Sequence, residues 1–213
     1  ALNPVTNKIY VASSGAASVT VIDGVTTATS TVAVGSQPIS LAVNPVTNRI
    51  YVANRGSNNV TVIDGTPHAT TTVPAGGFPR SVAVNPLTNT ISVANEAGAN
   101  VTVIDGATNA TTTLAAGTQP YSVAANPVTN KLYVANQSSA NVTVIDGATN
   151  GTATVTVGTQ PYSVAANPAT NKIYVTNRGS GNVTVIDGAT SGTSTVAAGT
   201  NPQQLAVNPV TNR

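Results

Sequence analysis

The side chains that most often carry acid–base or metal chemistry are few in this sequence and lie far apart. Of its six acidic residues, five are the Asp of a repeated Ile-Asp-Gly segment, spaced 41 residues apart, and the sixth is Glu96. Paired carboxylate catalysis needs two acids roughly 5–10 Å apart, and one acid per repeat does not supply such a pair. We therefore predict that the five are structural turn formers: Asp23, Asp64, Asp105, Asp146 and Asp187.

The single histidine, His68, has no partner residues for catalysis or metal binding. It follows an Asp-Gly pair, where other repeats carry Asn109 or Asn150, and the chain has no cysteine. Neither a second histidine nor a Gly-x-Ser-x-Gly segment is present, so zinc-type ligation and hydrolase-type catalysis lack their usual residues. We interpret His68 as a solvated loop residue and expect no catalytic residue, no metal and no cofactor.

A second group of chemically capable residues stands at positions that differ from repeat to repeat. Tyrosines at these positions could stack on a sugar or a peptide, and charged side chains could orient a ligand or meet an acidic partner. Concave sites with a few aromatic and polar groups are the usual ligand sites of proteins. The sequence therefore predicts a ligand- or partner-binding set: Arg55, Phe78, Arg80, Glu96, Tyr121, Tyr162 and Arg178.

The elements that must position these residues are set by a strict internal repeat. The motif Asn-Pro-Val-Thr-Asn and its two variants recur every 41 residues from Asn3 to Asn208, and Val-Thr-Val-Ile-Asp-Gly recurs at the same period. Each unit contains four short runs rich in Val, Ile, Thr and Tyr, and no window has helical periodicity. Four strands per unit of about 40 residues predict an all-β fold, a β-propeller of five four-stranded blades.

The two ends of the chain fall at the same point of the repeat. The chain opens with the tail of an inner strand at 1–7, and it closes with an inner strand at 203–207 and a repeated turn to 213. The sequence therefore predicts that the C-terminal inner strand joins the N-terminal blade and closes the ring, which leaves no free sheet edge. Residues 1–213 are then a single five-bladed domain. The alternative is a five-blade slice of a longer repeat protein.

The repeats differ mainly in loops that should share one face. Turns between first and second strands, and between third and fourth strands, lie on one face of a propeller, and the Asn-Pro-Val-Thr-Asn and Asp-Gly turns there barely vary. The loops between second and third strands vary, as does the residue that opens each inner strand. We expect these variable positions to surround one mouth of the central channel.

Composition excludes several classes of function. Only 7% of the residues are charged and the net charge is +2, with the basic residues scattered singly. Nucleic-acid binding requires clustered Lys and Arg, and a membrane span requires about 20 consecutive apolar residues, so we expect neither. A surface of hydroxyls and amides suits an extracellular setting. It also suits self-association, because little charge repulsion opposes it.

Several segments resemble a known repeat family. Tyr-Val-Ala-Asn at Tyr51 and Tyr133, Tyr-Val-Thr-Asn at Tyr174 and Val-Thr-Val-Ile-Asp-Gly-Ala-Thr-Asn resemble the YVTN-type β-propeller repeats of bacterial and archaeal surface-layer and secreted proteins. The resemblance covers essentially the whole chain and implies a propeller at the cell surface or outside the cell. Related propellers include lactonases, lyases and partner-binding proteins. The third repeat departs from the pattern with Thr90 and Ser92, which predicts weaker local packing or an opened site.

We thus expect a non-catalytic extracellular propeller that acts as a structural or interaction scaffold and binds a protein or glycan partner on its variable face. The first alternative is a lectin-type propeller, although only Tyr121 and Tyr162 supply aromatics at matching places. The second is a lactonase or lyase, which would need convergent acids, histidines or a metal. The inner strands instead carry Ser, Ala, Val and Asn.

Overall fold

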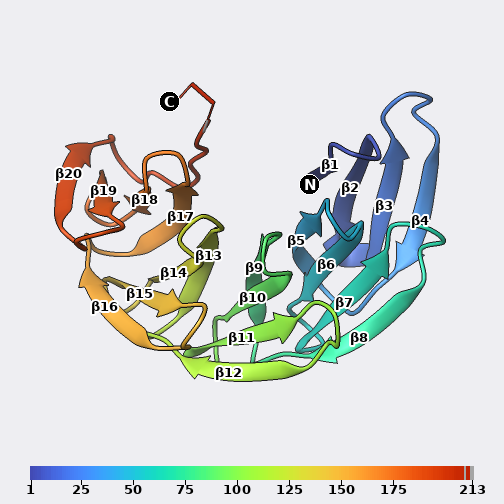
Figure 1. The fold of residues 1–213 in the computed structure, drawn as a ribbon, viewed down its shortest axis with the longest axis horizontal. Helices are drawn as coiled ribbons and strands as arrows, with labels where there is room; N and C mark the ends of the chain where they lie inside the picture. The colour runs from blue at the N-terminus through green and yellow to red at the C-terminus, as the bar shows by residue number, and fades with distance from the viewer. Residues whose placement is uncertain (209, 212–213) are drawn as a thin grey trace.

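The computed structural model describes residues 1–208 and 210–211. These residues form twenty β-strands and one short 3-10 helix, η1 (Ser14–Ala16). The strands make five four-stranded antiparallel sheets, each joined in sequence order and each built from one repeat. The structure therefore confirms the predicted all-β propeller of four-stranded blades (Figure 1).

The strands take matching positions in every blade. The first blade contains β1 (Leu2–Asn3), β2 (Lys8–Ser13), β3 (Ser18–Asp23) and β4 (Thr29–Ala33). The second contains β5 (Pro38–Asn44), β6 (Arg49–Asn54), β7 (Asn59–Asp64) and β8 (Thr70–Pro74). The third contains β9 (Pro79–Asn85), β10 (Thr90–Asn95), β11 (Asn100–Asp105) and β12 (Thr111–Ala115). The fourth contains β13 (Pro120–Asn126), β14 (Lys131–Asn136), β15 (Asn141–Asp146) and β16 (Thr152–Thr156). The fifth contains β17 (Pro161–Asn167), β18 (Lys172–Asn177), β19 (Asn182–Asp187) and β20 (Thr193–Ala197).

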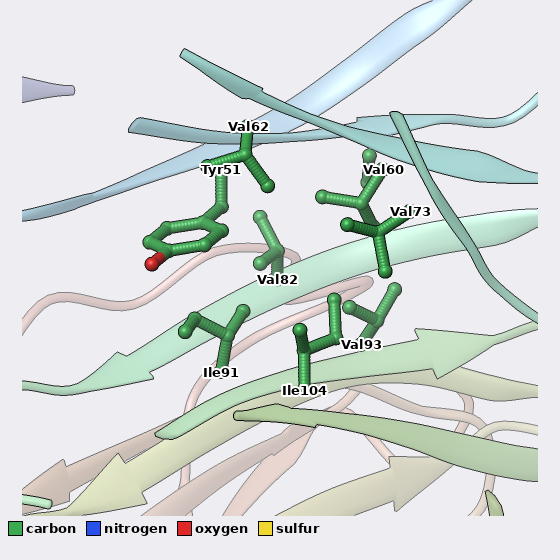
Figure 2. Close-up of a cluster of buried hydrophobic side chains, with 9 residues drawn as sticks. Tyr51, Val60, Val62, Val73, Val82, Ile91, Val93 and Ile104 are labelled. Atoms are coloured by element: carbon green, nitrogen blue, oxygen red, sulfur yellow. The ribbon is translucent and has the colours of Figure 1, made fainter. Parts of the chain in front are cut away.

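Blades pack face to face through an apolar interface that repeats along the chain. Tyr51, Val60, Val62 and Val73 of the second blade meet Val82, Ile91, Val93 and Ile104 of the third, as Figure 2 shows. The same pattern joins the first blade to the second and the fourth to the fifth. Burying a Val, Ile or Tyr side chain of this kind contributes about 1.5–3 kcal/mol. Both faces of a middle blade are therefore apolar, which explains why the strands do not alternate clearly between polar and apolar residues.

The Asn-Pro-x-Thr-Asn turns have the local geometry expected of their residues. The Asn44 Oδ1 accepts hydrogen bonds from the backbone N–H groups of Val46 (3.0 Å) and Thr47 (3.4 Å), which closes an Asx turn. The second Asn of the motif, Asn48, has a left-handed backbone with φ 54°. The Asn44 Nδ2 also donates to the Oδ1 of Asn89 in the next blade at 2.9 Å. The same bond to the next blade is made by Asn3, Asn85 and Asn126, so these turns fasten neighbouring blades.

Four of the five aspartates accept backbone hydrogen bonds within their own Asp-Gly turn. The Asp105 Oδ1 accepts backbone hydrogen bonds from Ala107 (2.9 Å) and Thr108 (2.8 Å), and the same pattern recurs at Asp23, Asp146 and Asp187. Asp64 differs, because Pro67, the third residue after it, has no backbone N–H. Its Oδ1 instead accepts a hydrogen bond from the Arg49 Nε at 3.1 Å.

The glycine of the Asp-Gly pair is needed for space and not for a left-handed backbone. Gly106 is not among the residues with positive φ; that conformation falls at Asn109, three residues later. A Cβ on Gly106 would instead lie 2.4 Å from the Oδ1 of Asn89. The glycine is therefore required by the close approach of the neighbouring Asn turn.

The third blade departs in packing rather than by opening a site. Ser92 stands where other blades have Tyr, and it is fully buried, with a hydroxyl that has no hydrogen-bond partner among the described residues. The apolar cluster between the third and fourth blades contains Leu132, Val134 and Ile145 but no aromatic ring. Of the two outcomes predicted for this departure, the structure thus favours a change in packing.

Among the described residues, the first and fifth blades leave one face each without a neighbouring blade. Ile9 and Val11 of β2 are 38% and 45% exposed, whereas the equivalent Ile50 and Val52 of β6 are fully buried. At the other end, Val196 of β20 is 57% exposed. Figure 1 shows these two blades at the ends of an arc. The residues exposed on these two end faces therefore hold positions that a neighbouring blade buries elsewhere in the arc.

Closure of the ring by residues 203–207 is the part of the fold prediction that the described residues do not show. The first blade takes its inner strand from β1, and residues 203–207 form no strand. The Gln203 carbonyl instead accepts a hydrogen bond from the Thr176 hydroxyl at 2.7 Å, which holds this segment beside the fifth blade. The rotation from each blade to the next leaves the two ends of the arc apart in Figure 1. The turn predicted at 208–213 lies partly outside the described residues.

Candidate ligand-binding site

The variable residues lie where a β-bulge begins each inner strand. In the fourth blade, Pro120 pairs with Asn136 and Ser122 with Ala135, so Tyr121 between them has no partner in the ladder. The same register shift leaves out Ile39, Arg80 and Tyr162 in the other blades. A bulge re-aims the side chain of its extra residue. The fold therefore gives these positions freedom to vary without disturbing strand pairing.

The predicted binding residues of the second and third blades meet around one carboxylate. The Glu96 Oε2 accepts hydrogen bonds from the Arg55 Nε at 3.3 Å and from the Arg80 Nη1 at 3.4 Å. The Arg55 guanidinium also lies over the Phe78 ring, 4.6 Å from its centroid. All four side chains are thus in contact, although they come from sequence positions up to 41 residues apart.

The same series of contacts continues into the fourth and fifth blades. The Arg80 guanidinium lies 3.6 Å from the centroid of the Tyr121 ring and also donates a hydrogen bond to the Tyr121 hydroxyl. The Tyr121 and Tyr162 ring centroids are 4.5 Å apart with the planes tilted by 45°, and Arg178 lies 5.9 Å from the Tyr162 centroid. The structure therefore brings together all seven residues that the sequence singled out. We call them the arginine–tyrosine cluster: Arg55, Phe78, Arg80, Glu96, Tyr121, Tyr162 and Arg178.

The cluster borders a hollow on the inner side of the arc. The hollow has a volume of about 280 Å³, and its lining includes Arg80, Tyr121 and Tyr162 together with one serine from each of four inner strands. These serines are Ser40, Ser81, Ser122 and Ser163. The hollow is thus walled by polar hydroxyls and edged by aromatic and guanidinium groups.

The serine row joins the inner strands of neighbouring blades. The Ser40 Oγ accepts the Val82 N–H at 3.3 Å, and the Ser81 and Ser122 hydroxyls accept from Val123 and Val164 at 3.2 Å each. Sequence reasoning did not select these serines. The available signal was their recurrence one position after the variable residue of each inner strand.

The electrostatics of the cluster are positive. The cluster has three arginines and one carboxylate: Arg55 and Arg80 pair with Glu96, whereas Arg178 has no acidic partner among the residues that the structure describes. Burial and, after it, a hydrogen bond with Tyr162 together raise the pKa of Tyr121 to about 12, although the Arg80 charge opposes the rise. Tyr121 is therefore a neutral hydroxyl at physiological pH.

Phe78 is held in a conformation that is unfavourable for a bulky residue. Its φ is 54° and the residue is 43% exposed. The equivalent residues Gln37, Gln119 and Gln160 share the left-handed backbone, so the repeat imposes it. Non-glycine residues in this region cost of order 1–3 kcal/mol, and an exposed ring repays little of that through burial. Contact with Arg55 is the interaction that the structure shows for this ring.

His68 lies outside the cluster, and its predicted solvation is wrong. The residue is half-buried, and its Nε2 is buried with no hydrogen-bond partner in the described part of the chain. Burial and the nearby Lys8 charge lower the pKa of His68. The Oδ1 of Asn109, at the equivalent position, is buried in the same way, so the position itself turns side-chain tips inward. Within the described ranges, no three His, Cys, Asp or Glu side chains gather to hold a metal ion.

The four-stranded antiparallel sheets are arrayed about a common inner side, which is the arrangement of a β-propeller. The polar site lies against the inner strands. A family model described as "Lactonase, 7-bladed beta-propeller" matches residues 3–112, slightly more than half of the 213 residues. The chain belongs to this family. Its resemblance to the YVTN-type surface-layer repeats remains a prediction.

Solved structures share the fold at low sequence identity. Hydrazine synthase of Kuenenia stuttgartiensis is 22% identical with a TM-score of 0.82, over 98% of this chain and 69% of that one. A functionally unknown protein from Desulfotomaculum acetoxidans is 12% identical with a TM-score of 0.81, over 94% and 69%. A chain of a nidogen/laminin complex is 14% identical with a TM-score of 0.72, over 92% and 78%. At these identities the likeness shows the propeller fold alone.

Two negative findings complete the comparison. No curated protein sequence matches this chain. In the described residues, no helix has the length and apolar character needed to cross a membrane.

Proposed function

We propose that this chain is a non-catalytic β-propeller binding module whose ligand or partner occupies the face bearing the arginine–tyrosine cluster. The observation that carries this proposal is the continuous contact of the seven cluster residues, from Phe78 through Glu96 to Arg178. They occupy positions that strand pairing does not constrain, so their joint presence serves surface chemistry rather than the fold. An extracellular or cell-surface setting accords with the low charge content of 7%.

The arrangement of the one carboxylate at the site supports a non-catalytic role over the lactonase chemistry in the family's description. A general base must be free to accept a proton from a water or a substrate. The Glu96 carboxylate is instead paired with two guanidinium groups, and its side chain is only 18% exposed. This arrangement suits positioning of the arginines.

A lectin-type function is the second candidate, and the Tyr121–Tyr162 pair favours it. Two tyrosine rings 4.5 Å apart beside a hydroxyl-lined hollow offer an apolar face and hydrogen-bonding groups to a sugar. A protein partner would use the same rings and the exposed Phe78 as aromatic anchors.

Binding to immobilised glycan and peptide arrays tests the proposal. We expect the chain to bind at least one class of probe, and Tyr121→Ala to lose that binding. Leu87→Ala is the matched control, because Leu87 is 71% exposed and belongs to an Asn-Pro-x-Thr-Asn turn at the far end of its strand. Turnover of lactones that persists through purification and falls with Glu96→Gln would overturn the non-catalytic proposal.

A further inference from the structure

A second hollow lies beside the arginine–tyrosine cluster, between loops of the fourth and fifth blades. It has a volume of about 490 Å³, within the range of roughly 300–1,000 Å³ that is usual for ligand sites. Its polar lining consists of Gln119, Gln137, Ser138, Thr159, Gln160 and Arg178. We call it the glutamine pocket.

The chemistry of the glutamine pocket is that of a site for hydroxyl-rich molecules. Three side-chain amides supply paired donors and acceptors, and two hydroxyls add groups that do both. Ala140 is its sole apolar lining residue in the described chain. Several modes of peptide recognition use apolar pockets or an open strand edge, whereas sugar hydroxyls need the groups that this pocket presents.

Arg178 adds a positive charge that the protein itself does not neutralise. Arg55 is the equivalent residue of the second repeat, and its guanidinium is paired with Glu96. Arg178 is exposed and has no acidic partner among the described residues. A planar guanidinium donates two parallel hydrogen bonds to a carboxylate, so Arg178 is a ready binding site for a ligand carboxylate.

The position of Arg178 connects the glutamine pocket to the surfaces on either side. It lies 5.9 Å from the Tyr162 ring centroid in the cluster. It also lines a third hollow of about 420 Å³ together with Gly179, Ser180 and Thr200. A chain-like ligand could therefore run past Arg178 and leave one unit in the pocket and the next against Tyr162.

We propose that the glutamine pocket binds an acidic glycan, a chain of sugars bearing uronic acid carboxylates. The amides and hydroxyls take the sugar hydroxyls, Arg178 takes the carboxylate, and Tyr162 supports the adjoining ring. This inference rests on the proposed binding function and names the ligand class for that face.

Calorimetric titration of the whole chain with a galacturonic acid trimer tests the inference. We expect saturable binding that is lost with the methyl-esterified trimer, which keeps the sugar rings and removes the charges. Arg178→Gln should weaken binding at least tenfold, and Arg178→Lys should weaken it less because the charge remains without the planar fork. Arg49→Gln is the matched control, since it removes the same charge at the end of its strand nearest the Asp-Gly turns, where Arg49 pairs with Asp64. Circular dichroism of each variant checks that the fold is retained.

Three results would overturn the inference. They are absence of binding to the trimer, equal binding by Arg178→Gln and wild type, and equal or tighter binding of a hexaglutamate peptide through Arg178. If Tyr121→Ala loses binding of an array-detected ligand and Arg178→Gln does not, the proposed function would stand and the proposal of an acidic glycan as the ligand would be overturned. Failure of the proposed function would instead show as no array binding sensitive to Tyr121.

Discussion

The Arg80 guanidinium lies over the ring of Tyr121, 3.6 Å from its centroid, and donates a hydrogen bond to the hydroxyl of the same tyrosine. These residues occupy the same bulge position in adjacent blades. The contact therefore depends on the turn between blades and not on any local sequence. It makes Tyr121 the point at which the part of the cluster around Glu96 joins the tyrosine pair.

This contact predicts an unusual titration of Tyr121. Its pKa is raised to about 12, first by burial and then by the hydrogen bond with Tyr162. The difference in absorbance at 295 nm between wild type and Tyr121→Phe should therefore develop near pH 12 and not near pH 10. In Tyr162→Phe the midpoint should move down, because one cause of the rise is gone.

The same shift sets a direction for stability at alkaline pH. A folded-state pKa above the unfolded value means that Tyr121 contributes its full stability below pH 10 and loses it as the pH rises through 12. Denaturant midpoints measured from pH 9 to pH 12 should fall less in Tyr121→Phe than in wild type. Equal slopes for the two proteins would show that Tyr121 is not responsible.

The glycine of the Asp-Gly turn should not tolerate a methyl group. A Cβ at Gly106 would lie 2.4 Å from the Asn89 Oδ1, and that Asn also fastens the second blade to the third. We expect Gly106→Ala to lower the free energy of unfolding by about 2 kcal/mol or more, in the range of strained or overpacked sites. Gly15→Ala is the control, since a Cβ there meets nothing within 4 Å. Similar losses in the two variants, measured by urea unfolding, would contradict this account.

Restoring the missing ring of the third blade should stabilise the protein. Ser92 is fully buried with an unpartnered hydroxyl, and Leu132 stands opposite where the other blades have Ile. The double variant Ser92→Tyr with Leu132→Ile places the side chains of Tyr51 and Ile91 at the equivalent positions of this interface, while Leu114 still stands where the interface between the second and third blades has Val73. We expect a gain of about 1–2 kcal/mol in unfolding free energy, as for other cavity-filling changes. A loss in the double variant would mean that these two blades pack too closely to accept the ring.

Acid should weaken the turns that aspartates close. Backbone and side-chain hydrogen bonds from Thr108, then the Ala107 N–H, lower the pKa of Asp105, and the Thr149 and Ala148 N–H groups do the same for Asp146. A depressed folded-state pKa contributes stability that is present above about pH 3.8 and is lost as the pH falls below it. Unfolding midpoints between pH 5 and pH 2 should therefore fall more steeply in wild type than in Asp105→Asn with Asp146→Asn. Parallel curves would show that these charges do not matter to the fold.

Particular residues show what could and could not be read from the sequence. The 41-residue period located every blade, and the Asx turns at Asn44 and Asp105 followed from local chemistry. Comparison of the repeats selected the cluster residues. It did not reveal the Asn44–Asn89 bond or the serine row, because contacts between repeats depend on the angle at which blades meet. Ring closure by residues 203–207 stays a prediction, since the curvature of the arc comes from the packing of the blades and not from the repeat count.

The two ends of the arc give the most direct test of what covers them in solution. Ile9 and Ile50 hold the same place in β2 and β6, yet Ile9 is 38% exposed and Ile50 is fully buried. If the end face of the first blade is open to water, Ile9→Ala should cost well under 1 kcal/mol, whereas Ile50→Ala should cost about 2–5 kcal/mol. Urea unfolding of both variants at several protein concentrations measures the difference. A cost for Ile9→Ala that approaches that of Ile50→Ala and grows with protein concentration would show that the end face is buried by another copy. An equal cost independent of concentration would place a covering segment of the same chain on it.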